Sequence, residues 1–350
     1  QHWFDAVGQE CRHVAAHAGI LELTGFSRFH ASGAGADAWL IRQITGNLPR
    51  VGRIGLVYFA SPKGKMLSEM TVTRFAENDF LLMSGAGAYW HDRDLLMANL
   101  PSDGSVQITD VTYDLATLLV TGPKAPAILA DLTGHSMAND DFAWLACRKI
   151  EIAGDEVTAI RVSFAGEAGF EIHCKMDNIV AVYDAITAAG AAYELAPFGM
   201  LALDSMRLEK GYRSWKSDLT SDYTMLESGL GRWVNFNKDD FVGRTALQAE
   251  QQAGSKNEFV TLVLDDPDDG EPFGDAVYLS SVVIDGNVAG LVLSGGYGHR
   301  VGASIAMAVV YCGALRAAKD ISVLVLGRSR RAVLVDGHVL YDPENIKMKG

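Results

Sequence analysis

Asp204 and Arg207 are two charged residues inside a stretch that otherwise has the pattern of an apolar helix face. They lie three positions apart in Pro197–Leu219, which has the sequence PFGMLALDSMRLEKGYRSWKSDL. At 100° per residue both fall near the middle of the apolar face, whereas Ser205 and Glu209 point to the opposite side. A guanidinium on a buried face needs a partner. Two partners are open: Asp204 as an intrahelical pair, or an anion or carbonyl in a ligand cavity.

Two histidines give a candidate metal site. His13 and His17 are i,i+4 neighbours in a predicted helix within residues 2–23, and such a pair can hold zinc. No third ligand has suitable spacing nearby. We therefore expect a half-exposed helix face and no metal.

Two segments in the first half of the chain share one pattern. Phe29–Gly46 (FHASGAGADAWLIRQITG) and Leu118–Gly134 (LLVTGPKAPAILADLTG) each read as a strand, a Ser/Thr-Gly turn, a helix and a Thr-Gly stop. The two turn glycines, Gly33 and Gly122, lie 89 positions apart.

The strands Asp79–Gly85 and Gly169–Lys175 repeat at nearly the same offset, because Phe80 and Phe170 lie 90 positions apart. We predict an internal duplication of an α+β unit within residues 20–195. The junction of two such units is a natural place for a ligand cleft.

From Phe259 onward the chain consists of short β-type runs separated by turns, which predicts a small antiparallel barrel. The polar segment 248–257 breaks at Gly254 and marks the expected boundary. The predicted domains are therefore residues 1–250 and 251–350.

Composition narrows the classes of partner. The 350 residues carry a net charge of −13, which argues against nucleic acid or an anionic membrane as the main partner. No apolar run is long enough to span a bilayer. The four cysteines lie far apart without C-x-x-C spacing, so we expect reduced thiols and a cytoplasmic location, or the mitochondrial matrix in a eukaryote.

Three blocks together resemble the aminomethyltransferase (glycine cleavage T-protein) family: Met200–Thr220, Phe164–Cys174 and Ser294–Val310. The tail Leu340–Gly350 and the segment Tyr89–Pro101 are most similar to one branch, the folate-binding C-terminal part of dimethylglycine and sarcosine dehydrogenases. The resemblance implies an α+β fold of three subdomains, two duplicated α+β units and a C-terminal antiparallel β-barrel. It also implies that they form a ring around a central folate channel.

The resemblance implies that Glu167 is the pterin-binding carboxylate, since a carboxylate accepts two neighbouring N–H donors of a pterin. The alternative is an ordinary turn glutamate. Arg207 would then face the pterin or Glu167.

The family's essential acid falls on Asp92, because the spacing from His91–Asp92 to Pro101 matches the dehydrogenase branch. Asp94 is nearly as good by spacing. A carboxylate there can hold a cationic iminium or methylamine and assist attack by a folate nitrogen. For both residues the alternative is a carboxylate favoured by the helix dipole.

Aromatic residues are expected to line the folate channel. Tyr58, Tyr212 and Trp215 can stack on the pterin or benzoyl ring, although each is individually also a plausible core residue. Tyr297 and His299, in the glycine-rich GGYGH turn, are expected to close the channel from the barrel side.

The implied function is a tetrahydrofolate-dependent enzyme that accepts a methylene or iminium unit from an N-methylated amine such as dimethylglycine or sarcosine and forms 5,10-methylene-tetrahydrofolate. Two alternatives remain: direct demethylation of a methylated amine or sulfonium osmolyte, and a non-catalytic folate-binding assembly protein. Members of the dehydrogenase branch carry an upstream flavin domain. We therefore expect this chain to be part of a longer fusion, to work with a separate flavin-dependent oxidase, or to accept a ready-made one-carbon unit.

Overall fold

The computed structural model describes residues 2–265 and 274–350. The chain forms two compact units. Unit 1 comprises Gln1–Phe59, Ser68–Leu203 and Glu344–Gly350, and unit 2 comprises Ala60–Leu67 and Asp204–Pro343.

Unit 1 is built on two β-sheets with helices packed on them. The first sheet has the strand order β3-β4-β5-β2-β6 and the second β11-β1-β7-β10-β9-β8. The strands of the first sheet are β2 (Ser27–Ser32), β3 (Arg53–Ala60), β4 (Met66–Ala76), β5 (Asp79–Ser84) and β6 (Gln107–Asp110). Those of the second are β1 (Ala18–Glu22), β7 (Leu115–Thr121), β8 (Cys147–Ile152), β9 (Asp155–Arg161), β10 (Gly169–Lys175) and β11 (Leu195–Pro197). The helices are α1 (Phe4–Ala16), α2 (Ala36–Gln43), α3 (Tyr89–Ala98), α4 (Ala125–Thr133), α5 (Ile179–Gly190) and α9 (Ile346–Lys349).

The strand orders confirm the predicted duplication. When the second sheet is read from its other edge, β8-β9-β10-β7-β1 matches β3-β4-β5-β2-β6 strand for strand. The turn glycines Gly33 and Gly122 both have a positive φ (113° and 124°). A Cβ at either position would clash with backbone atoms. Glycine is therefore required at both turns.

The match also shows that the two repeats exchange their first strands. β1 precedes β2 in the first repeat but pairs with β7 of the second, whereas β6 precedes β7 but pairs with β2 of the first. Neither sheet is completed by one repeat alone. This exchange was not part of the sequence prediction, because it depends on pairing between distant segments.

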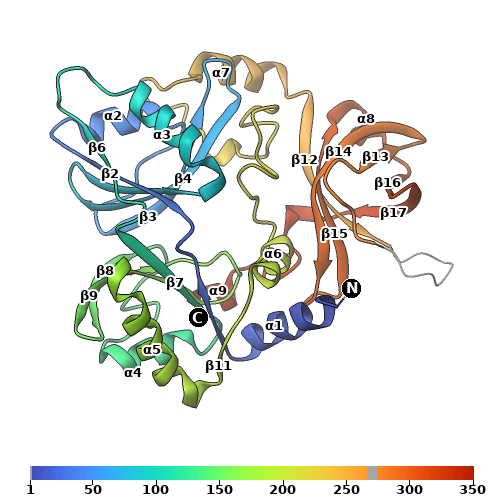
Figure 1. Cartoon of the computed structure of the whole chain (residues 1–350). Coiled ribbons are helices and arrows are strands. Elements are labelled where there is room, and N and C mark those ends of the chain that lie inside the picture. The colour runs from blue at the N-terminus through green and yellow to red at the C-terminus, as the bar shows by residue number, and fades with distance from the viewer. Residues whose placement is uncertain (1, 266–273) are drawn as a thin grey trace. The chain divides into compact units, whose positions relative to one another are not determined.

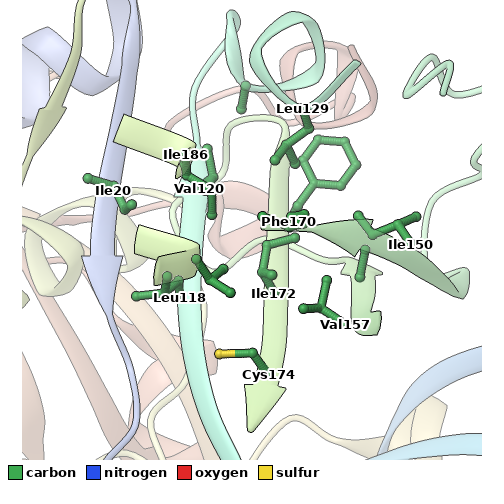
Figure 2. Packing of buried hydrophobic residues seen from close by; sticks show 14 of the residues in the cluster. Ile20, Leu118, Val120, Leu129, Ile150, Val157, Phe170, Ile172, Cys174 and Ile186 are labelled. Carbon is green, nitrogen blue, oxygen red and sulfur yellow. The ribbon is translucent and has the colours of Figure 1, made fainter. Parts of the chain in front are cut away.

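The second sheet and its helices enclose the main core of unit 1. Figure 2 shows Leu118 and Val120 on β7 beside Phe170 and Ile172 on β10. These alternate residues point to the same face, as the two-residue period of a strand dictates. Helices α4 and α5 cover that face and add their apolar residues to the cluster, among them Leu129 and Ile186.

Unit 2 contains the predicted barrel. Six strands close it in the order β12-β15-β14-β13-β16-β17 (Figure 1). They are β12 (Asn257–Leu264), β13 (Ser281–Ile284), β14 (Asn287–Gly298), β15 (Ala303–Tyr311), β16 (Ile321–Val325) and β17 (Arg328–Leu334). Small and branched apolar side chains fill its interior. The mixed α+β fold with a C-terminal β-barrel is thus confirmed. Helices α7 (Arg244–Ala253) and α8 (Cys312–Ala317) also belong to this unit.

Helix α6 (Met200–Glu209) corrects the amphipathic prediction. Leu201, assigned to the buried face, is 56% exposed, whereas Ser205 and Glu209, assigned to the outer side, are buried. The reason lies in contacts within unit 2. Ser205 Oγ donates to the Tyr297 carbonyl at 2.7 Å, and the Glu209 carboxylate pairs with Arg300. The carboxyl-terminal half of α6 is therefore buried on several sides rather than on one.

Candidate functional site

Arg207 lies at the centre of a polar network within unit 2. Its Nε donates to Asp204 Oδ1 at 2.7 Å, so the intrahelical pair predicted as one alternative is present. Its Nη1 donates to the Tyr212 carbonyl at 3.1 Å and to Asp218 Oδ2, and its Nη2 donates to Ser294 Oγ at 3.0 Å. The guanidinium thus binds two carboxylates and a hydroxyl of its own unit. A contact with a ligand remains a prediction.

The buried partner of Arg207 is Asp218, a residue that the sequence analysis did not single out. The Asp218 side chain has no exposed surface, whereas that of Asp204 is 53% exposed. Burial by itself lowers the pKa of the Arg207 guanidinium, but the charges of Asp218 and Asp204 and their hydrogen bonds outweigh it and raise that pKa. Arg207 therefore remains charged although it is buried.

The loop after α6 carries two of the predicted aromatic residues, Tyr212 and Trp215. Its turn is held by Asp218, whose Oδ2 accepts from the Ser214 backbone N–H at 2.9 Å. Lys216 has a positive φ of 71°, and its Nζ lies 4.6 Å from the Trp215 ring centroid. Burial raises the pKa of Tyr212 to about 12. Arg207 and Asp218 therefore fix the backbone that presents both aromatic side chains.

Tyr297 and His299 lie at the end of β14 and just beyond it. Their rings meet edge to face with centroids 5.2 Å apart. Ser205 of α6 ties this turn to the helix, since its Oγ donates to the Tyr297 carbonyl and accepts from the His299 backbone N–H at 3.3 Å. Within unit 2 the structure thus places these two residues beside α6.

Two buried ion pairs near the end of α6 also escaped the sequence analysis. Glu209 pairs with Arg300, and Lys210 Nζ lies 3.3 Å from Asp342 Oδ2. All four side chains are almost completely buried. The only sequence signal was a Glu-Lys dipeptide that directly continues an apolar helix.

In unit 1, the structure separates Asp92 from Asp94. Both lie in α3, but the Asp94 side chain is 74% exposed and is paired with Arg93 at 3.4 Å, whereas the Asp92 side chain has no exposed surface. Asp92 Oδ1 lies 2.9 Å from His91 Nδ1. Its Oδ2 is buried and has no hydrogen-bond partner within the described residues. An unsatisfied carboxylate oxygen costs free energy when it is buried, so this atom calls for a partner such as an ordered water or a ligand.

Glu167 is buried in the loop between β9 and β10. The loop turns sharply at Gly166 (φ 80°), whose N–H donates to Ser163 Oγ at 3.0 Å. Glu167 therefore lies in a turn between two strands, as its alternative supposed, and its binding of a pterin remains a prediction. Tyr58 is buried on β3, where its carbonyl accepts from the Thr45 N–H at 2.9 Å.

The predicted site residues divide between the units. Unit 1 carries Asp92, Asp94, Glu167 and Tyr58, and unit 2 carries Arg207, Tyr212, Trp215, Tyr297 and His299. Over the described ranges, the chain has no group of three or more His, Cys, Asp or Glu side chains placed to hold a metal ion. No helix in the same residues is long and apolar enough to cross a membrane.

Comparison with known proteins gives matches along almost the whole chain. Residues 1–238 match the GCVT N-terminal domain, and residues 257–342 match the glycine cleavage T-protein C-terminal barrel domain. The chain is 32% identical to mitochondrial dimethylglycine dehydrogenase of Homo sapiens over 99% of its own length, but it spans only 40% of that protein. It is 27% identical to an aminomethyltransferase of Caldanaerobacter subterraneus, with 95% of this chain and 87% of that protein covered.

A solved structure gives the same result for the fold. The glycine cleavage system aminomethyltransferase T from Bartonella henselae matches with a TM-score of 0.82 and 23% identity, over 95% of this chain and 90% of that one. The resemblance stated from the sequence blocks is thereby confirmed. Since one family model alone covers residues 1–238, the chain belongs to the glycine cleavage T-protein (aminomethyltransferase) family, a family of transferases.

Proposed function

We propose that this chain transfers a one-carbon unit to tetrahydrofolate, accepting it as a methylene or iminium group from an N-methylated amine such as dimethylglycine or sarcosine. The observation that carries the proposal is the buried Asp92 carboxylate, whose Oδ2 has no hydrogen-bond partner among the described residues. Membership of the aminomethyltransferase family and the match to dimethylglycine dehydrogenase support it.

The residues of unit 1 fit a folate. Glu167 is a buried carboxylate in a loop, which suits the paired N–H donors of a pterin ring. Asp92 supplies a second carboxylate, which the surrounding protein leaves half satisfied. When bound, tetrahydrofolate supplies the nucleophilic nitrogens that accept the carbon.

Each protein group then has one task. The Glu167 carboxylate binds and orients the pterin. The Asp92 carboxylate attracts the cationic carbon donor and accepts a proton from the attacking nitrogen. The donor's amine takes up this proton and leaves as the second folate nitrogen closes the methylene bridge. Because the Asp92 side chain is completely buried, its charge acts more strongly than it would in bulk solvent. In unit 2, Arg207 and Asp218 hold the loop that carries Tyr212 and Trp215.

The donor's origin is a further part of the proposal. The chain spans 40% of the dimethylglycine dehydrogenase and 34% of the sarcosine dehydrogenase that it matches, and both names denote an oxidation. We propose that a flavin-dependent oxidase, as a domain of a longer chain or as a separate protein, oxidises the N-methylated amine to the iminium that this chain receives.

The experiment supplies the chain with tetrahydrofolate, sarcosine and a separate flavin-dependent amine oxidase, and identifies the folate product by mass. The expected product is 5,10-methylene-tetrahydrofolate, formed faster than without the chain. Formation of 5-methyl-tetrahydrofolate would instead indicate direct demethylation. Folate binding without any acceleration would indicate a non-catalytic binder.

Two pairs of variants assign the residues. Asp92→Asn should lower kcat by about 100-fold or more. Asp94 is a neighbour on the same helix with an exposed side chain, and Asp94→Asn should leave kcat unchanged. Glu167→Gln should weaken tetrahydrofolate binding about 10-fold or more, since it removes one charge-assisted acceptor. Its control is Glu156→Gln on the surface. Unchanged turnover in Asp92→Asn would overturn the catalytic assignment.

A further inference from the structure

Among the described residues, His91 is the only one whose side chain hydrogen-bonds to the Asp92 carboxylate. Its Nδ1 lies 2.9 Å from Asp92 Oδ1. An ionised carboxylate has only acceptors, so the imidazole is the donor. Over the described residues no other side-chain hydrogen bond reaches Asp92, and Oδ2 has none. The two carboxylate oxygens therefore differ: one is anchored to His91 and the other is unsatisfied.

The surroundings make this anchor effective. The Asp92 side chain is completely buried, whereas the His91 ring is 43% exposed. The imidazole thus donates from the solvent side of the helix, and the unsatisfied oxygen lies in the interior. A carboxylate turns about its terminal bond over a broad range of angles unless it is held. A fixed donor to Oδ1 consequently fixes the direction of Oδ2.

We infer that His91 is a positioning residue for the one-carbon transfer, in that its Nδ1–H orients Asp92 so that Oδ2 faces the reacting atoms. The inference rests on the proposed function, in which Asp92 is the catalytic carboxylate. His91 itself acts through Asp92 and touches neither folate nor donor. Correct orientation of one catalytic group can change a rate by about two orders of magnitude.

The test replaces the Nδ1 donor while keeping the size of the side chain. His91→Leu removes the donor. His91→Asn retains an amide donor close to the position of Nδ1. The matched control is His30→Leu, because His30 also pairs with a carboxylate, Asp79, at 2.7 Å and has a ring exposed to a similar extent (38%). Steady-state kinetics, tetrahydrofolate affinity and thermal midpoint are measured for each variant.

We expect His91→Leu to lower kcat about 10-fold or more, with KM and Kd for tetrahydrofolate within about twofold of the unchanged chain. His91→Asn should restore kcat to within about threefold, and His30→Leu should leave kcat unchanged. A His91→Leu, Asp92→Asn double variant should be no slower than Asp92→Asn alone, because residues that act as a unit are not additive.

The outcomes separate the inference from the proposed function. If Asp92→Asn lowers kcat but His91→Leu does not, the positioning role is refuted and the proposed function stands. The role is also refuted if His91→Asn is as slow as His91→Leu, or if kcat falls only in step with the thermal midpoint. If Asp92→Asn itself has no effect, the catalytic assignment fails, and the role of His91 fails with it.

Discussion

Replacement of Arg207 by methionine should destabilise unit 2 strongly, because it leaves the carboxylate of Asp218 buried without its cation. Asp218 would retain the hydrogen bond from the Ser214 N–H, and its Oδ1 already has no partner within the described residues. Removal of one member of a buried ion pair costs about 3–5 kcal/mol. The half-exposed partner behaves differently, and Asp204→Asn should cost only about 0.2–1 kcal/mol.

A double-mutant cycle isolates the buried contact. Asp218→Asn keeps the shape of the side chain and its acceptor oxygen but removes the charge, so it should cost about 2 kcal/mol. The double variant Arg207→Met, Asp218→Asn no longer holds an uncompensated buried charge. It should therefore be more stable than the sum of the two single changes predicts, by about 1–3 kcal/mol.

Urea unfolding followed by tryptophan fluorescence measures these differences, because Trp215 and Trp233 lie in unit 2. The reasoning would be refuted if Asp204→Asn cost as much as Asp218→Asn, or if Arg207→Met cost less than about 1 kcal/mol. Folate affinity measured on the same variants then separates a structural role from direct contact. A direct ligand contact predicts a loss of affinity in Arg207→Met that exceeds the loss in Asp218→Asn under conditions where both are fully folded.

Two further predictions concern titration and backbone conformation. Because burial raises the pKa of Tyr212 to about 12 in the folded chain, the unfolded chain loses this proton first, at about pH 10. The contribution of Tyr212 to the free energy of unfolding should be fully present below pH 10 and lost as the pH rises to 12. Tyr212→Phe should lose less stability over that range. A difference titration at 295 nm should show a midpoint near 12 rather than near 10. The repeat-related turns should respond alike: Gly33→Ala and Gly122→Ala would bring a Cβ to 2.4 Å and 2.6 Å from backbone oxygens at a positive φ, and each should cost about 3 kcal/mol or more. Gly134→Ala, at a positive φ in open space, is the matched control and should cost only about 1 kcal/mol by the same unfolding assay.

The duplicated units and the barrel could be predicted because their signals are local. The Gly33 and Gly122 turns, the strand runs and their common offset are all visible within short windows of sequence. The exchange of β1 and β6 was not predictable in this way, since a strand's own residues do not specify which distant strand it pairs with. Long-range pairing of this kind becomes visible only in the folded chain.

The same limit explains the errors on α6. A helical wheel assigns burial from one chain segment, but Glu209 is buried because Arg300, 91 residues later, pairs with it. The wheel did indicate that Arg207 needs a partner, and it proposed Asp204 correctly. It could not reveal Asp218, because that residue reaches Arg207 through a turn whose shape depends on its own hydrogen bonds. For Asp92 and Asp94, spacing left two candidates, and their difference in burial now favours Asp92 for the proposed role.

The duplication also explains an asymmetry at the junction of the two repeats. Arg28 on β2 and Thr117 on β7 are equivalent by the 89-residue offset, and they touch: Arg28 Nη2 donates to Thr117 Oγ1 at 2.7 Å, in the interior. Equivalent residues that meet in this way lie on the pseudo-twofold axis. Two arginines there would place like charges in contact inside the protein, and two threonines would leave the volume of a guanidinium unfilled. A buried contact on the axis therefore favours different residues at the two equivalent positions. Packing alone thus requires the two repeats to differ in sequence at Arg28 and Thr117.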